Sequence, residues 1–282
     1  MKALKINCPI CDRREWRYLG TSSLYIINNK FVSTDIYQCK RCGVLFREAD
    51  ENTWWQHFQC ASYTLLDKEN ENKQAREGFF KYILKLLREY LPLKLDMKVQ
   101  KVLDIGCSYG HLLDILKKKG LKTYGVETNE SLYQKLNKDG KHQIYHTLYE
   151  IQDKFEIITF IDSLYYFKNP SEILGIAKDL LARGGVILCR VTNRVWLIKL
   201  FLLFHRSSYI PYNLIGDARW SFSPKSLKML FQKVGFSTLK FIYIEKEKNM
   251  GYKKSLFYLL TQIISLLTPL KLCPGIICIA KK

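Results

Sequence analysis

Lys101-Val-Leu-Asp-Ile-Gly-Cys-Ser-Tyr-Gly110 is an apolar run that leads into a turn with two glycines. The run predicts a buried strand over Lys101–Ile105, and glycine permits the sharp turn that follows it. We expect a helix over His111–Lys119, ended by Gly120, and a second strand over Thr123–Glu127. A strand, turn, helix and strand in this order predict an α/β protein with a parallel sheet.

The second strand ends in an acidic residue, Glu127, which lies 23 residues beyond Asp104. A carboxylate at this position can accept hydrogen bonds from both hydroxyls of a ribose. A turn that binds a pyrophosphate has the pattern Gly-x-Gly-x-x-Gly, whereas this turn reads Gly106-Cys-Ser-Tyr-Gly110 and lacks the middle glycine. Asp104 before the turn suits a cofactor with a cationic amino-acid end instead.

These residues resemble motif I and the acidic second strand of class I S-adenosylmethionine (SAM)-dependent methyltransferases, and later segments resemble the same family in order. The later segments are a fourth strand at Lys154–Leu164, a loop at Tyr165–Pro170, a Gly-Gly turn and fifth strand at Leu181–Val191, a helix within Phe222–Phe236, and a hairpin of Ser237–Ile244 with Gly275–Ala280. The resemblance spans residues 99–282 and implies a Rossmann-like sheet with helices on both faces.

The resemblance also implies which residues hold SAM. Asp104, Gly106, Cys107 and Gly110 would line its methionine and ribose side, Glu127 would hold the ribose, Thr128 and Leu148 would border the adenine, and Asp162 would close the pocket below the sulfonium. An ordinary strand-to-helix turn is the alternative interpretation of the two glycines. The stretch Tyr145–Glu150 lacks the acid that often meets the adenine amino group in the family.

Four of the nine cysteines form two Cys-x-x-Cys pairs, Cys8 with Cys11 and Cys39 with Cys42. Two such pairs can supply four thiolates to one tetrahedral Zn²⁺, and a site closed by four protein ligands is structural. The 27 residues between the pairs read as strands, as in a zinc ribbon. Four reduced or redox-active cysteines are the alternative. We therefore expect a ribbon over residues 1–50, in front of a helical connector or cap over residues 51–98.

The connector contains apolar residues at helical spacing between Phe79 and Tyr90. Its aromatic residues and one histidine can border the pocket of the next domain or belong to the core; they are Trp54, Trp55, His57 and Tyr63. Ribbon, connector and methyltransferase core in one chain are similar to a bacterial group that includes sugar methyltransferases.

The general base of such an enzyme is not evident in this sequence. Relatives often carry Glu-His where this chain has Tyr165-Tyr166, and a phenol with a pKa of about 10 is a poor base at neutral pH. His205, Asp217 and Tyr166 are the candidates that we retain. Methyl transfer relies chiefly on alignment of the nucleophile and exclusion of water, so transfer without a strong base is also open.

The net charge of +19 is concentrated in residues 193–282, which hold 15 basic and 3 acidic residues, a balance of +12. This part includes an insertion at about residues 193–222, expected to be lid-like, and the apolar stretches Val195–Phe204 and Leu256–Leu270. Neither reaches the about 20 apolar residues of a membrane span. Buried or lid helices are one interpretation, and helices lying on an anionic membrane surface are the other.

Together these observations predict a SAM-dependent methyltransferase that acts on a small-molecule or glycan acceptor, with a sugar intermediate of cell-surface polysaccharide biosynthesis as the acceptor class that the resemblance favours. Residues 1–16 contain no apolar run typical of a signal peptide, so we expect a cytoplasmic protein, with peripheral membrane contact left open. Nucleic acid is a disfavoured partner because no aromatic-basic motif appears. An RNA methyltransferase and an inactive zinc-binding scaffold remain the alternatives.

Overall fold

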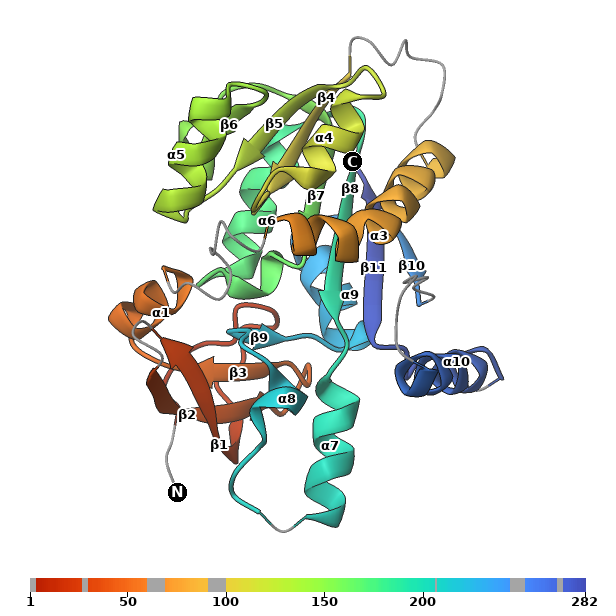
Figure 1. Cartoon of the computed structure of the whole chain (residues 1–282). Coiled ribbons are helices and arrows are strands. Elements are labelled where there is room, and N and C mark those ends of the chain that lie inside the picture. The colour runs from red at the N-terminus through yellow and green to blue at the C-terminus, as the bar shows by residue number, and fades with distance from the viewer. Residues whose placement is uncertain are drawn as a thin grey trace.

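A computed structural model describes residues 4–26, 30–59, 69–90, 100–205, 207–243, 252–267 and 271–282. Its largest element is a seven-stranded sheet with the order β10-β11-β8-β7-β4-β5-β6 (Figure 1). The strands are β4 (Lys101–Ile105), β5 (Lys122–Val126), β6 (Gln143–Tyr145), β7 (Phe155–Ile161), β8 (Leu181–Thr192), β10 (Thr238–Ile242) and β11 (Gly275–Lys281). Strands β4 to β8 run parallel, whereas β11 is antiparallel to β8 and β10, which confirms the predicted sheet and its final hairpin.

Helices cover both faces of this sheet. Successive side chains of β4 point to opposite faces of the sheet. Val102 packs on one face with α3 (Glu69–Tyr90) and α4 (His111–Lys117). Leu103 packs on the other face with α6 (Pro170–Leu180) and α9 (Pro224–Lys233). Helix α5 (Glu130–Asp139) packs beside α4 through Leu136. Two short 3₁₀ turns follow strands β6 and β7, at Leu148–Glu150 and Leu164–Tyr166.

The N-terminal part forms a second, four-stranded sheet with the order β1-β2-β3-β9. Its strands are β1 (Trp16–Ile26), β2 (Lys30–Cys39), β3 (Leu45–Glu48) and β9 (Trp220–Ser221). Strand β1 is one continuous strand whose register against β2 shifts next to Gly20. A Cβ atom on Gly20 would lie 2.2 Å from the carbonyl oxygen of Ser208, so only glycine permits this crossing.

The insertion at residues 193–222 contains α7 (Val195–Phe204), α8 (Tyr212–Ile215) and β9. It packs against the N-terminal sheet, because β9 pairs with β3 and the backbone of Thr21 exchanges hydrogen bonds with Ser208 and Ile210. The insertion therefore completes the N-terminal sheet, in addition to any role as a lid. Trp220 joins the two sheets, since its indole N–H donates to the carbonyl oxygen of Phe167 beside β7.

Two helices outside the sheets complete the fold. Helix α1 (Glu51–Phe58) lies between the two sheets, and α10 (Tyr252–Leu267) lies at one end of the molecule, close to the start of β11 (Figure 1). Asp50 caps α1 by accepting a hydrogen bond from the Thr53 amide. Across the described ranges, no helix combines the length and the apolar character that a membrane crossing requires.

Candidate active site

The glycine turn after β4 lies at the carboxyl end of the parallel strands, where α/β proteins bind their ligands. Gly106 and Gly110 have φ angles of 80° and 74°, in the left-handed region that favours glycine. A Cβ atom on Gly106 would lie 2.5 Å from the Cβ atom of Ser163, which follows β7. The missing side chain therefore lets the turn after β4 approach the turn after β7.

Glu127 follows β5 and is held in one orientation by two backbone amides. Its carboxylate accepts hydrogen bonds from the N–H groups of Ser108 and Asn129, both at 2.8 Å. Glu127 is 8% exposed, and this burial raises the pKa of its carboxylate. The arrangement fits a carboxylate that receives the hydroxyls of a ribose across the turn.

Asp104, on β4, is buried at the same edge of the sheet. Thr159 of β7 donates to its carboxylate at 2.6 Å. Burial raises the pKa of Asp104 to about 7, against the lowering effects of the Thr159 hydrogen bond and of Arg76. A buried carboxylate of this kind is stabilised by a cation, so the site fits the ammonium end of SAM.

Asp162, directly after β7, lies between two arginines. Arg190 of β8 and Arg76 of α3 both donate to its carboxylate, Arg76 at 2.6 Å. Burial raises the pKa of Asp162, but the two guanidinium groups lower it further, so the net shift is downward. The φ angle of Asp162 is 60°, which is uncommon for a residue with a side chain. Asp162 therefore joins α3 to the edge where the sulfonium is predicted to lie. Arg76 and Arg190 are cationic residues at this edge that no motif in the sequence indicates.

The other predicted cofactor residues differ in their surroundings. The Cys107 side chain packs in the core with Leu113 and Ile144, so its backbone is the part that faces the turn. Leu148 is buried, in the 3₁₀ turn after β6, and Thr128 is exposed beside Glu127. The structure thus brings the turn, Glu127 and Asp162 to one edge of the sheet and leaves Cys107 pointing into the core.

Helix α1 covers this edge from the N-terminal side. The Asn129 side-chain amide, next to Glu127, donates to the carbonyl oxygen of Phe58 at 3.0 Å and to the side chain of Gln59 at 3.2 Å. At the other end of the edge, the Phe58 ring lies 5.7 Å from the Tyr166 ring, centre to centre. Helix α1 therefore reaches from the carboxyl end of β5 to the turn after β7.

His57 on α1 and Asp217 in the insertion form a buried pair beside Tyr166. The His57 Nε2 atom lies 3.9 Å from the Asp217 Oδ2 atom, and the His57 ring lies 6.4 Å from the Tyr166 ring. Their side chains are 1% and 16% exposed, so Asp217 is the partner that a bound molecule can reach. The ring-nitrogen Nδ1 of His57 lies 2.7 Å from the carbonyl oxygen of Tyr25, which can only accept, so Nδ1 carries a proton.

In this tautomer Nε2 is the nitrogen that can take up a proton beside Asp217, at a separation longer than a hydrogen bond. With a hydrogen on Nδ1, Nε2 is either protonated against an Asp217 carboxylate or unprotonated against an Asp217 carboxylic acid. Burial lowers the pKa of His57 and raises the pKa of Asp217, so the two values approach each other. When the pair has lost this proton it is a base.

The N-terminal sheet holds both members of the pair. Tyr25 belongs to β1, and Arg47 of β3 donates to the carbonyl oxygen of Gly216, the residue before Asp217, at 2.6 Å. Arg47 also donates to the Thr34 hydroxyl at 2.6 Å. Burial lowers the pKa of Arg47 to about 10, so it stays cationic at neutral pH. The position of the pair thus depends on the N-terminal sheet.

The other catalytic candidates have different surroundings. His205 is exposed at the end of α7, and its ring stacks on Phe201 of the same helix at 4.5 Å. Burial raises the pKa of Tyr166 well above its ordinary value, which makes its phenol a still weaker base. Tyr63, a predicted border residue, lies outside the described residues. His57 had been identified only as a border residue, because its partner Asp217 is 160 positions away in the sequence.

The four paired cysteines come together as predicted. Their sulfur atoms all lie within 4.8 Å of one another, with Cys8 and Cys42 at 3.6 Å and Cys11 and Cys39 at 3.5 Å. Zn–S bonds of about 2.3 Å in a tetrahedron place sulfur atoms about 3.8 Å apart, so the cluster has the size of a zinc site. Gly43, after the second pair, has a φ angle of 78° and donates its amide to the Cys39 carbonyl oxygen.

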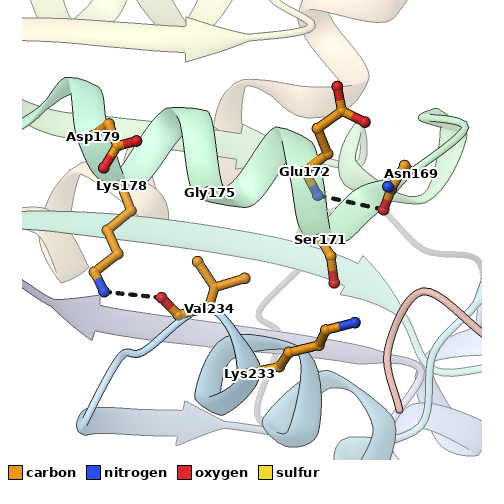
Figure 2. A pocket seen from close by; sticks show the side chains of 8 residues that line it. All are labelled: Asn169, Ser171, Glu172, Gly175, Lys178, Asp179, Lys233 and Val234. Atoms are coloured by element: carbon orange, nitrogen blue, oxygen red, sulfur yellow. Dashed lines mark hydrogen bonds between the residues drawn. The ribbon is translucent and has the colours of Figure 1, made fainter. Parts of the chain in front are cut away.

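A surface pocket of about 460 Å³ lies apart from these groups, between α6 and the end of α9. Figure 2 shows Lys178 reaching across it to the carbonyl oxygen of Val234, at 2.8 Å. Its lining mixes two lysines with Glu172 and Asp179. None of the predicted site residues lines this pocket.

Residues 72–240 match the model of a family described as a methyltransferase domain. A ubiquinone biosynthesis O-methyltransferase of Coxiella burnetii is 28% identical over 115 residues, which cover 38% of this chain and 49% of that protein. The chain thus spans about half the length of the curated relatives it matches.

Solved structures show the same fold at low sequence identity. A SAM-dependent methyltransferase from Archaeoglobus fulgidus has a TM-score of 0.53 at 17% identity, and the match covers 79% of this chain and 100% of that chain. A plantazolicin methyltransferase, in complex with a triazolic desmethylPZN analog and SAH, has a TM-score of 0.54 at 17% identity, covering 82% of this chain and 93% of that chain.

Proposed function

Because this chain belongs to the methyltransferase-domain family, we propose that it transfers a methyl group from SAM to a hydroxyl group of a small-molecule or glycan acceptor. The observation that carries the proposal is the His57–Asp217 pair, a buried proton acceptor beside the turn after β7. A hydroxyl nucleophile needs such a base, because its proton must leave as the new bond forms. The Coxiella relative is an O-methyltransferase, which supports the same class of acceptor atom.

SAM would be held by residues at the edge described above. Glu127 would accept from the ribose hydroxyls, and Asp104 would face the ammonium group; when bound, SAM supplies an electrophilic methyl group on a sulfonium. The chain's residues then bind, orient and exclude water, which is the main source of rate acceleration in a displacement of this kind. Helix α1 and Tyr166 would cover the acceptor, and the Asp217 carboxylate would receive its proton with His57 behind it.

Two observations indicate two candidate classes of acceptor. The combination of ribbon, connector and core supports a sugar or glycan intermediate, and the aromatic rings of Phe58 and Tyr166 offer surfaces on which a sugar ring can stack. The Coxiella relative, an O-methyltransferase of ubiquinone biosynthesis, supports an intermediate of ubiquinone biosynthesis as the second candidate. Incubation with radiolabelled SAM and matched panels of nucleotide sugars, glycolipids and phenols tests both. Label in bulk RNA but in neither panel would contradict the proposal.

Four cysteine thiolates would hold a structural zinc ion in the ribbon. With four protein ligands the ion has no open position for a substrate, so its role is to fix the N-terminal sheet. No step of methyl transfer passes through it.

Replacing Glu127 with alanine is expected to raise the Kd for SAM by about 10²–10⁴-fold. Two hydrogen bonds to a charged group are lost, each worth about 1.5–3 kcal/mol. Isothermal titration calorimetry on the purified protein measures this change, with a thermal melt to check folding. Glu130→Ala is the matched control, since Glu130 is an exposed glutamate three residues away. Equal affinities for the wild type and Glu127→Ala would refute the assignment.

A further inference from the structure

On helix α10, polar side chains are buried against the protein and apolar side chains are exposed, the opposite of an ordinary surface helix. Thr261 and Ser265, two of its polar residues, are buried at 4% and 5% exposure. Ser265 is tied to the chain after the helix, because its hydroxyl accepts from the Leu272 amide at 2.8 Å. Apolar side chains on the helix are 38–79% exposed, namely Leu256, Leu259, Leu260, Ile263, Ile264 and Leu267.

Helix α7 adds a second exposed apolar surface. It packs on the N-terminal sheet through Val195 and Ile198, while Leu200, Leu203 and Phe204 are 46%, 75% and 73% exposed. Among the residues with described side chains, α7 and α10 supply nine of the fourteen exposed large hydrophobic residues. Soluble surfaces seldom concentrate apolar residues in this way, so the concentration marks a contact surface.

The two helices are attached to the same end of the central sheet. Thr192, at the end of β8, pairs with Gly275, at the start of β11. Asn193 joins the two connections, since its side-chain amide donates to the carbonyl oxygens of Lys271 at 2.8 Å and Cys273 at 2.9 Å. In Figure 1 both helices lie beyond this end of the sheet. We define the apolar docking surface as the exposed residues of α7 and α10.

The charge of α7 and α10 indicates which kind of partner binds the apolar docking surface. Neither helix contains an acidic residue, α7 carries an exposed Lys199, and Lys253 and Lys254 lie in the first turn of α10. The whole of residues 193–282 has a balance of +12, from 15 basic and 3 acidic residues. Apolar helices flanked by lysines bind the interface of anionic bilayers, where insertion of side chains and attraction to lipid headgroups add together.

We propose that the apolar docking surface binds peripherally to an anionic lipid bilayer. Arg190, which contacts Asp162 at the active site, lies three residues before Asn193 on the same strand end. Docking would therefore place the acceptor edge at the bilayer, where an acceptor anchored in lipid is presented. The consequence for the acceptor rests on the proposed function, whereas the binding itself does not.

Co-sedimentation of the full chain with vesicles tests the proposal without SAM or acceptor. We expect the wild type to pellet with vesicles of equal parts phosphatidylglycerol and phosphatidylcholine at an ionic strength of about 0.1 M. Binding should fall in phosphatidylcholine alone and at high salt. The variants L203E/F204E and L260E/I263E should each lower the vesicle partition coefficient at least tenfold. Tyr149→Glu is the matched control, because Tyr149 is 69% exposed outside this surface and should bind like the wild type.

Three results would overturn the proposal: wild type that stays in the supernatant, double variants that pellet like wild type, or a lipid-free wild-type oligomer that L203E/F204E converts to monomer. The last would assign the surface to a second copy of the chain. Unchanged SAM titration and thermal melts show that the variants are folded. If the protein methylates a soluble acceptor but does not bind vesicles, only this inference is overturned. If it binds vesicles but transfers no methyl group, only the proposed function is overturned.

Discussion

Replacing His57 with alanine is expected to lower kcat by about 10²–10⁴-fold, the usual contribution of a general acid–base group, while leaving the Kd for SAM almost unchanged. The separation follows from position, because His57 contacts Tyr25, Asp217 and Tyr166 on the acceptor side. Glu127 and Asp104 are instead held by Ser108, Asn129 and Thr159. Initial rates at saturating SAM measure the first quantity and calorimetry the second. His205→Ala is the matched control, since that imidazole is exposed on α7.

The pH profile distinguishes catalysis from a structural role. The unprotonated pair is the active form, so kcat should fall as pH decreases through the pKa of the pair. His57 lowers the pKa of Asp217, so His57→Ala raises that pKa and moves the acid limb of the residual activity to higher pH. Asp217 raises the pKa of His57, so Asp217→Asn moves the limb to lower pH. The charged groups facing His57 are Asp217 and Arg47, and Arg47 is unchanged in both variants. Limbs that coincide with the wild type in both would rule out the pair as the base.

Replacing Cys39 with serine is expected to release the metal ion and to lower the melting temperature by about 10 °C. Structural zinc sites contribute free energy directly to folding, and a chain of this size loses about 2–4 °C for each kcal/mol. Metal content follows from mass spectrometry of the native protein and stability from calorimetry. Cys273→Ser is the matched control, because Cys273 lies away from the cluster and serine can keep its hydrogen bond to the Gly275 carbonyl oxygen.

The same variant should separate methyl transfer from cofactor binding. The N-terminal sheet holds His57 through Tyr25 and holds Asp217 through Arg47 and Gly216, whereas Glu127 is held by Ser108 and Asn129. In Cys39→Ser we therefore expect kcat to fall by at least about tenfold and the Kd for SAM to change by less than about threefold. Retention of stoichiometric zinc by Cys39→Ser would contradict the zinc ribbon. Equal losses of kcat and of affinity for SAM would contradict the conclusion that the N-terminal sheet supports only the acceptor side.

The central sheet was predictable because local pattern determines it. Apolar runs, glycines and the acid after the second strand lie within Lys101–Glu127, and the structure confirms their order. The cysteine cluster was predictable for a similar reason, since Cys-x-x-Cys spacing alone brings two sulfurs together. In both cases, residues close in the sequence carry the signal.

The acceptor side was not predictable, because its contacts join residues far apart in the sequence. Asp217 was a candidate and His57 a possible border residue, but nothing in the sequence indicates that they meet. The same holds for Arg76 and Asp162, which are 86 positions apart. Strand β9 has only two residues, too few for alternation to reveal a strand, so its place in the N-terminal sheet was also missed.

That short strand has a consequence for how the protein is made. The paired cysteines and strands β1 to β3 precede Trp220 and Ser221 in the chain, so their sheet acquires its fourth strand only when those two residues have been synthesised. Strands β4 to β8 of the central sheet lie between β3 and β9 in the chain. A fragment that ends before the insertion would lack this fourth strand and leave the edge of β3 without its partner.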